Sequence, residues 1–217
     1  MNHLDVLAAP RPKWRGVLHS WAFWATIPAG ALLIVFAEHT SGKTASAVYV
    51  GALLAVFGTS AAYHRLAHSY RARVVMQRLD HAMIYLLIAG SYVPICVVGL
   101  PRSWGIPLLS VVGGLAVLGI VVKLVAFSKL AWLSYSLYLV MGWCAVVAFP
   151  AILRSLSPLE IVLVVAGGLA YTSGLPVLLL RRPDPRPDVF GYHEVWHGCT
   201  VVAAALHFAG VTSLVVA

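Results

Sequence analysis

The stretch "WGIPLLSVVGGLAVLGIVVKL", residues 104–124, holds a single charged side chain, Lys123, in 21 positions. An apolar run of about 20 residues is long enough to cross the hydrocarbon core of a bilayer as an α-helix. The rest of the chain has the same character, because 61% of its 217 residues are hydrophobic, 10% are charged and its mean hydropathy is +0.90. Soluble domains carry roughly 25% charged residues. The composition therefore predicts an integral membrane protein.

Charged and turn residues on either side of this run divide the chain into seven apolar segments. The segments cover about 18–38, 44–64, 79–99, 104–124, 130–150, 158–180 and 191–216. None shows the two-residue alternation of a barrel strand, and hydrocarbon requires a backbone that satisfies its own hydrogen bonds. We therefore predict an all-α fold, a seven-transmembrane helix bundle forming one domain over residues 1–217. The first run is too long and too rich in tryptophan to favour the alternative of a signal peptide.

The lysines and arginines are unevenly distributed among the predicted connections. Twelve of the 15 lie in the N-terminal segment and in the second, fourth and sixth connections, whereas the remaining connections hold only Lys43, Arg102 and Arg154. Positive charge collects on the cytoplasmic side of membrane proteins. The pattern predicts a multi-pass protein of the cell membrane with a cytoplasmic N-terminus and an outside C-terminus. It also accounts for the net charge of +8 without a nucleic-acid partner.

Polar and metal-binding side chains gather at one predicted depth of the bundle. His193 and His197 in the stretch "GYHEVWH" are four residues apart, so both imidazoles can reach one ion from the same helix face. Under the predicted topology the seventh span begins at the membrane level where the second span ends and the third begins. His64 ends the second span, Ser60 lies one turn earlier on the same face, and Asp80 begins the third span. Three helices thus bring these five residues to one level, on the cytoplasmic side.

These residue types suit hydrolytic chemistry. Three neutral imidazoles around Zn²⁺ leave one position for water, and such a site lowers the pKa of that water to ~7. Asp80 could accept the proton of the water and return it to a leaving group. Ser60 could hold the same water or stabilise an oxyanion. A carboxylate inside a membrane costs at least ~2.5 kcal/mol at the bilayer centre and less near the interface, which by itself marks Asp80 as a functional candidate.

Four stretches of the chain carry a resemblance to a known family. They are "RGVLH" (15–19), "SAAYH" (60–64), "RLDHAMIYLLIAGSYVP" (78–94) and "FGYHEVWHGCTVVAAALHF" (190–208). In this order they resemble the hemolysin III branch of the progestin and adipoQ receptor family, which includes adiponectin receptors. The pattern of serine, aspartate and spaced histidines is also similar, more distantly, to that of alkaline ceramidases.

The resemblance implies a seven-helix bundle with a zinc ion on its cytoplasmic side. By this resemblance Zn²⁺ is held by the metal ligands His64, His193 and His197, and Ser60 and Asp80 lie near the metal water as catalytic residues. The implied activity is that of a zinc-dependent hydrolase acting on a lipid amide or ester. The expected partner is therefore a membrane lipid, ceramide-like or fatty-acyl in character.

Other functions remain open at this point. An intramembrane metalloprotease would use Glu194 as the base and would need a further ligand such as Asp188. Glu194 is better explained as a partner of an arginine or as a cap of its helix, because acids are favoured at helix starts. A non-enzymatic sensor or regulator of membrane lipids, with zinc joining the second and seventh spans, is one alternative. A pore-forming cytolysin is another, and it would need a continuous polar stripe through the bundle.

The remaining histidines and the cysteines are expected to lie outside the metal site. His19 and His207 sit within or at the edges of spans, where a histidine usually serves a polar pathway or an interhelical hydrogen bond. His81 points away from Asp80 and is expected to contact a loop, and His68 is expected to be solvated. Three cysteines, Cys96, Cys144 and Cys199, lie in spans without metal-type spacing.

Overall fold

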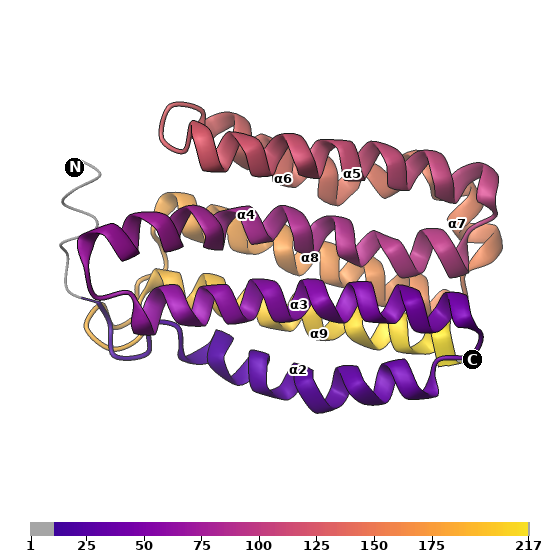
Figure 1. Cartoon of the computed structure of the whole chain (residues 1–217), viewed down its shortest axis with the longest axis horizontal. Helices are drawn as coiled ribbons and strands as arrows, with labels where there is room; N and C mark the ends of the chain where they lie inside the picture. Colours follow the sequence, from indigo (N-terminus) through magenta and orange to yellow (C-terminus); the bar gives the residue numbers. More distant parts are fainter. Residues whose placement is uncertain (1–10, 217) are drawn as a thin grey trace.

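The computed structural model describes residues 11–216, and these residues form a bundle of long helices (Figure 1). Within these residues, seven helical segments are long and apolar enough to cross a membrane, which confirms the predicted all-α seven-helix bundle. In the described part of the chain the only β pairing is an isolated bridge between Arg186 and Phe190. The ends of the predicted domain, residues 1–10 and 217, lie outside the described residues. The elements are α2 (Val17–Phe36), α3 (Thr40–Leu66), α4 (Tyr70–Pro94), η1 (Ile95–Gly99), α5 (Arg102–Val125), α6 (Ala131–Trp143), η2 (Cys144–Ala148), α7 (Phe149–Ser155), α8 (Pro158–Leu180) and α9 (Tyr192–Val216).

The third span begins earlier than the sequence pattern suggests. The hydropathy change places its start near residue 79, but α4 begins at Tyr70, after an N-cap in which the Ser69 side chain accepts a hydrogen bond from the Ala72 amide. Ser69 satisfies an amide that the first helical turn would otherwise leave unpaired. Arginine is a good helix former and extends its charged head away from an apolar stem, so the basic residues continue the helix beyond the apolar run.

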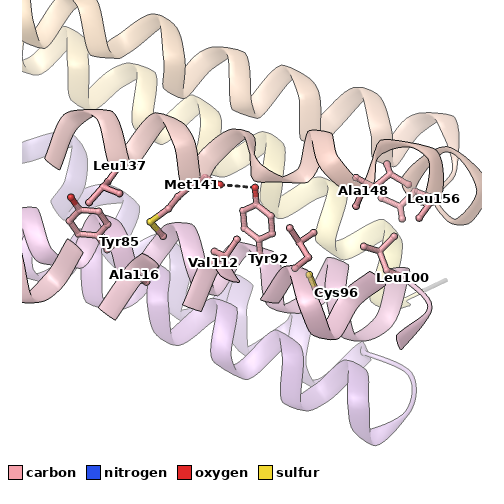
Figure 2. Packing of buried hydrophobic residues seen from close by; sticks show 13 residues of the cluster. Tyr85, Tyr92, Cys96, Leu100, Val112, Ala116, Leu137, Met141, Ala148 and Leu156 are labelled. Atoms are coloured by element: carbon pink, nitrogen blue, oxygen red, sulfur yellow. Dashed lines mark hydrogen bonds between the residues drawn. The ribbon is translucent and has the colours of Figure 1, made fainter. Parts of the chain in front are cut away.

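The fifth span is interrupted near its middle. The α-helix α6 ends at Trp143, the chain passes through the 3₁₀ turn η2, and α7 completes the crossing at Ser155. Pro150, the second residue of α7, cannot donate a backbone hydrogen bond to the preceding turn. Tyr92 of α4 compensates for the break, because its hydroxyl donates to the Met141 carbonyl at 2.8 Å (Figure 2). The same hydroxyl accepts a hydrogen bond from the Ala145 amide at 3.0 Å. Backbone groups freed inside a membrane need such partners.

The order of packing brings the last helix against the first ones. Helices that follow one another in the chain pack closely, as α2 does with α3, α3 with α4, α4 with α5, and α8 with α9. In addition, α9 contacts α2, α3 and α4, so residues more than a hundred positions apart meet inside the bundle. Figure 1 shows α3 and α9 running side by side, with the end of α3 and the start of α9 at the same end of the molecule. This arrangement positions the candidate site.

The outward faces of the bundle are apolar, as a lipid-facing surface requires. Large hydrophobic side chains such as Trp24, Leu32 and Val147 are 67%, 57% and 75% exposed. A soluble protein rarely exposes so continuous an apolar surface, whereas a membrane protein turns it toward the acyl chains.

Candidate metal centre

Three histidines from two helices meet at the end of the bundle where α3 finishes and α9 starts. His64 lies in the last turn of α3, and His193 and His197 lie in the first two turns of α9. One ligand nitrogen from each ring lies within 4.8 Å of the others. His64 and His197 are buried, and His193 is half-buried. The structure therefore brings together the three residues that the sequence analysis proposed as metal ligands, and they could hold a metal ion.

The spacing of two of these nitrogens would suit a zinc ion. His64 Nε2 and His193 Nε2 are 3.2 Å apart. Two imidazole nitrogens at ~2.0–2.1 Å from one tetrahedral zinc ion are separated by ~3.3 Å. The same separation also suits a hydrogen bond in which one ring donates to the other. His197 Nδ1 is buried and has no hydrogen-bond partner among residues 11–216, so its ring is not committed to a network on that side.

Asp80 and Ser60 border the histidine cluster from two helices. A carboxylate oxygen of Asp80, Oδ2, lies 4.0 Å from His64 Nε2. Ser60 is 1% exposed and lies one helical turn before His64. The Ser60 side chain is close enough to the Asp80 carboxyl to act on it electrostatically, but its Oγ has no hydrogen-bond partner in the described part of the chain. An unpaired buried hydroxyl beside a carboxylate is costly unless another group uses it.

Glu194 is bonded through both of its oxygens. Its Oε1 accepts a hydrogen bond from Arg15 Nε at 2.6 Å, and its Oε2 accepts one from the Gly191 amide at 2.8 Å. The expectation that this residue pairs with an arginine or caps its helix is confirmed in both respects. Asp188, the further ligand that a protease would need, is exposed and lies outside the histidine cluster. The geometry required of an HExxH protease is therefore not met.

His207 and His68 take the structural roles expected of them, whereas His81 lies closer to Asp80 than expected, with its Nδ1 3.8 Å from Asp80 Oδ2. His207 Nε2 contacts the Val164 carbonyl of α8 at 3.0 Å, an interhelical bond remote from the cluster. His81 contacts the Gln77 carbonyl of its own helix at 2.9 Å and faces Phe127 in the connection after α5. His68 is exposed.

Two residues near the site have contacts that the sequence pattern alone does not reveal. His19 of α2 stacks on His197, with ring centroids 3.7 Å apart and an interplanar angle of 11°. Lys123, counted above as part of a connection, is instead 1% exposed in the last turn of α5. Its ammonium lies 4.8 Å from the Phe127 ring centroid and 5.1 Å from that of Tyr135, distances typical of cation–π contacts. A lysine near the end of a span was the only sequence signal for this contact.

Comparisons with known proteins agree with these features. The family described as "Haemolysin-III related" matches residues 7–208 of the chain. The "Hemolysin-3 homolog" of Bacillus subtilis (strain 168) is 28% identical over 195 residues, which is 88% of each chain.

Two eukaryotic relatives share somewhat less of the chain. The "Heptahelical transmembrane protein ADIPOR2" of Oryza sativa subsp. japonica is 31% identical over 183 residues, or 77% of this chain and 80% of the relative. The "Adiponectin receptor protein" of Drosophila melanogaster is 30% identical over 187 residues, or 77% of this chain and 41% of the relative. From the family match and these relatives, the chain belongs to the haemolysin-III related family of multi-pass membrane proteins and is related to the adiponectin receptors.

Proposed function

We propose that the protein is a zinc-dependent membrane hydrolase that cleaves an amide or ester bond of a lipid. One observation carries the proposal: ligand nitrogens of His64, His193 and His197 lie within 4.8 Å of one another, and the Asp80 carboxylate lies 4.0 Å from His64. Structural zinc sites are normally closed by four protein ligands, whereas catalytic sites keep one position open. Among residues 11–216 the cluster consists of three histidines, which favours the catalytic arrangement.

Residues of the protein bind the metal, transfer the proton and stabilise the developing negative charge. Zinc bound with an open position supplies an activated water nucleophile at neutral pH. Asp80 Oδ2 accepts the proton of the attacking water and later returns it to the leaving amine or alcohol. Ser60 donates a hydrogen bond from its hydroxyl, which has no partner among residues 11–216, to the carbonyl oxygen as negative charge develops there. Glu194 takes no part in proton transfer, because both of its oxygens are already bonded.

The depth of the cluster suits a lipid linkage. His64 precedes the end of α3 by two residues, and His193 and His197 follow the start of α9 by one and five residues. With a rise of 1.5 Å per residue, the ligands lie roughly 2–8 Å inside the helix ends. The amide or ester bond of a lipid lies at this depth, between its headgroup and its acyl chain. The distribution of lysines and arginines supports a reaction in the cytoplasmic leaflet.

The test compares metal content and lipid composition. Purified wild-type protein should hold about one zinc per chain, and cells that express it should lose one class of lipid amide or ester and gain the matching free fatty acid. Asp80→Ala should keep the zinc and abolish the lipid change, because general acid–base groups contribute about 10²–10⁴-fold to rate. The exposed-histidine variant His68→Ala should behave as wild type.

The same experiment separates the competing functions. Zinc retained with an unchanged lipid profile in wild-type cells would support a sensor in which the metal joins α3 and α9. Leakage of vesicles in the presence of the purified protein, equal for wild type and Asp80→Ala, would support a pore-forming cytolysin. Zinc held equally well by His64→Ala and wild type would refute the three-histidine site itself.

A further inference from the structure

Residues 11–19, termed here the N-terminal clamp, contact both helices that carry the histidine ligands. Arg11, Arg15 and His19 follow one another at intervals of four residues. Arg11 Nη1 donates to the His64 carbonyl at 2.7 Å, and Arg15 Nε donates to Glu194 Oε1 at 2.6 Å. The clamp is therefore bonded to the end of α3 at the ligand His64 and to the start of α9 at Glu194, the residue next to the ligand His193.

The third member of the clamp touches a ligand ring directly. His19 is 5% exposed, and its imidazole lies nearly parallel to that of His197 at 3.7 Å between centroids. The His19 ring also contacts the ring of Phe57 in α3, and the two ring centroids are 5.2 Å apart. A ring held in this way limits rotation of the His197 imidazole about its side-chain torsions.

A short chain of hydrogen bonds fixes the orientation of His19. Thr200 Oγ1 donates its only hydrogen to the His197 carbonyl at 2.8 Å. The 2.9 Å contact between His19 Nε2 and Thr200 Oγ1 must then be donated by the histidine. His19 is thus held with its proton on Nε2, and it is anchored to the same turn of α9 that presents His197. The remaining nitrogen, Nδ1, has no partner among the described residues.

Gly16 permits the clamp to approach α3, the helix that carries the ligand His64, closely. Its φ of 79° lies in the left-handed region that L side chains rarely adopt. A Cβ at this position would lie 2.6 Å from His64 Cβ and 3.2 Å from Arg65 Cγ. Any larger residue would push the clamp away from His64 or displace the ligand itself.

From these contacts we propose that the N-terminal clamp positions the metal ligands, with His19 acting as a positioning residue that orients the His197 imidazole. The inference rests on the metal-binding part of the proposed function and adds that the clamp, which supplies none of the three histidine ligands, determines how well the metal is held. Groups that orient metal ligands typically contribute 10–100-fold to metal affinity. The clamp should act on metal affinity and ligand geometry before it acts on folding.

The test measures Co²⁺ binding, because the absorption bands of cobalt report ligand geometry independently of any enzymatic activity. His19→Ala should weaken cobalt and zinc binding about 10–100-fold in chelator competition and alter the cobalt spectrum. His19→Phe keeps a ring against His197 but lacks the bond to Thr200, so its affinity should fall between those of His19→Ala and wild type. Thr200→Val, which removes the same bond from the other side, should match His19→Phe.

The matched control is His207→Ala, which removes a half-buried histidine with an interhelical bond but lies outside the cluster. Its cobalt affinity and spectrum should equal those of wild type, while the melting temperature of the metal-free protein reports any general loss of stability in each variant. Equal cobalt binding by wild type, His19→Ala and His19→Phe would overturn the inference, as would an equal loss in His207→Ala. A wild-type protein that binds neither cobalt nor zinc would instead remove the proposed function and the clamp with it.

Discussion

At the scale of single residues, Glu194 shows how the same short motif can serve different purposes. In an HExxH protease the glutamate must face the metal water. Here the carboxylate ties the start of α9 to the N-terminal segment through Arg15 and caps the helix through the Gly191 amide. The residue is fully buried, so its charge depends on these partners. Its contribution should therefore appear in stability and in the contact of the N-terminal clamp with α9, and not in proton transfer at the metal site.

Glu194→Gln should lower stability while the protein still binds zinc at saturating metal. The glutamine oxygen can still accept from the Gly191 amide, but the glutamine NH2 group then faces the Arg15 Nε donor, so the charge-assisted hydrogen bond to Arg15 is lost. Hydrogen bonds to charged groups contribute about 1.5–3 kcal/mol to the free energy of unfolding, and the variant should lose part of this contribution. The loss should be measured as a lower melting temperature of the detergent-solubilised protein. The exposed-residue control Glu38→Gln should melt as wild type does. A Glu194→Gln protein that melts normally, or that fails to bind zinc, would contradict this role.

Single residues also mark the limit of what the sequence predicts. His64, His193 and His197 could be placed together because span order and helix periodicity set their membrane depth. Depth does not determine the rotation of a helix about its axis. The contact of His19 with His197 depends on that rotation in α2 and on its packing against α9, which the residue pattern does not encode. Lys123 was missed for the same reason, because a lysine at a span end is normally expected to extend toward water.

At the scale of helices, glycines set the close packing of neighbouring elements. Lipid tails are as apolar as the helices, so helix association in a membrane depends on close van der Waals contact between small residues. An added Cβ on Gly105 of α5 would lie 2.1 Å from the Cys96 carbonyl oxygen in η1. This neighbour is backbone and cannot rotate away. At Gly113 of the same helix an added Cβ would meet nothing within 4 Å.

Alanine substitutions at these two glycines should therefore have opposite effects. Gly105→Ala should destabilise the protein by about 1–3 kcal/mol, as overpacking does, because α5 must shift away from η1. Gly113→Ala should be neutral or slightly stabilising, since alanine favours helices over glycine by about 1 kcal/mol. The measurement is the melting temperature of each purified variant in the same detergent. Equal melting temperatures would show that the close approach at Gly105 does not determine how α5 packs against η1.

Helix boundaries were predicted less well than helix number, and the reason is physical. Hydropathy marks where the chain leaves hydrocarbon, whereas a helix ends where its backbone hydrogen bonds end. In α4 these points differ, because Ser69 caps the helix well before the apolar run begins. In the fifth span the helix is interrupted before Pro150, and the Tyr92 hydroxyl bonds to the backbone carbonyl of Met141 ahead of this interruption. The apolar run of the span is nevertheless continuous at this point. Neither feature changes the mean hydropathy from which the spans were predicted.

At the scale of the whole molecule, the alternation of the helices gathers basic residues at the end that carries the histidine cluster. The clamp arginines, the start of α4, the connection after α5 and the segment after α8 all lie at this end, whereas the opposite end holds Lys43, Arg102 and Arg154 (Figure 1). Lys123 is buried among aromatic rings and adds nothing to the surface charge. The asymmetry remains large without it, so the positive-inside rule predicts that the candidate metal centre faces the cytoplasm.

This orientation can be tested with single cysteines in the full chain. Ser128, in the connection after α5, and Ser41, at the start of α3, are both exposed and lie at opposite ends of the bundle. In a parent chain whose three native cysteines are replaced by alanine, a membrane-impermeant maleimide should label Ser41→Cys in intact cells. Ser128→Cys should react only after the cells are opened, because basic connections stay on the cytoplasmic side. Labelling of Ser128→Cys in intact cells would place the metal centre outside and would move the proposed reaction to the opposite leaflet.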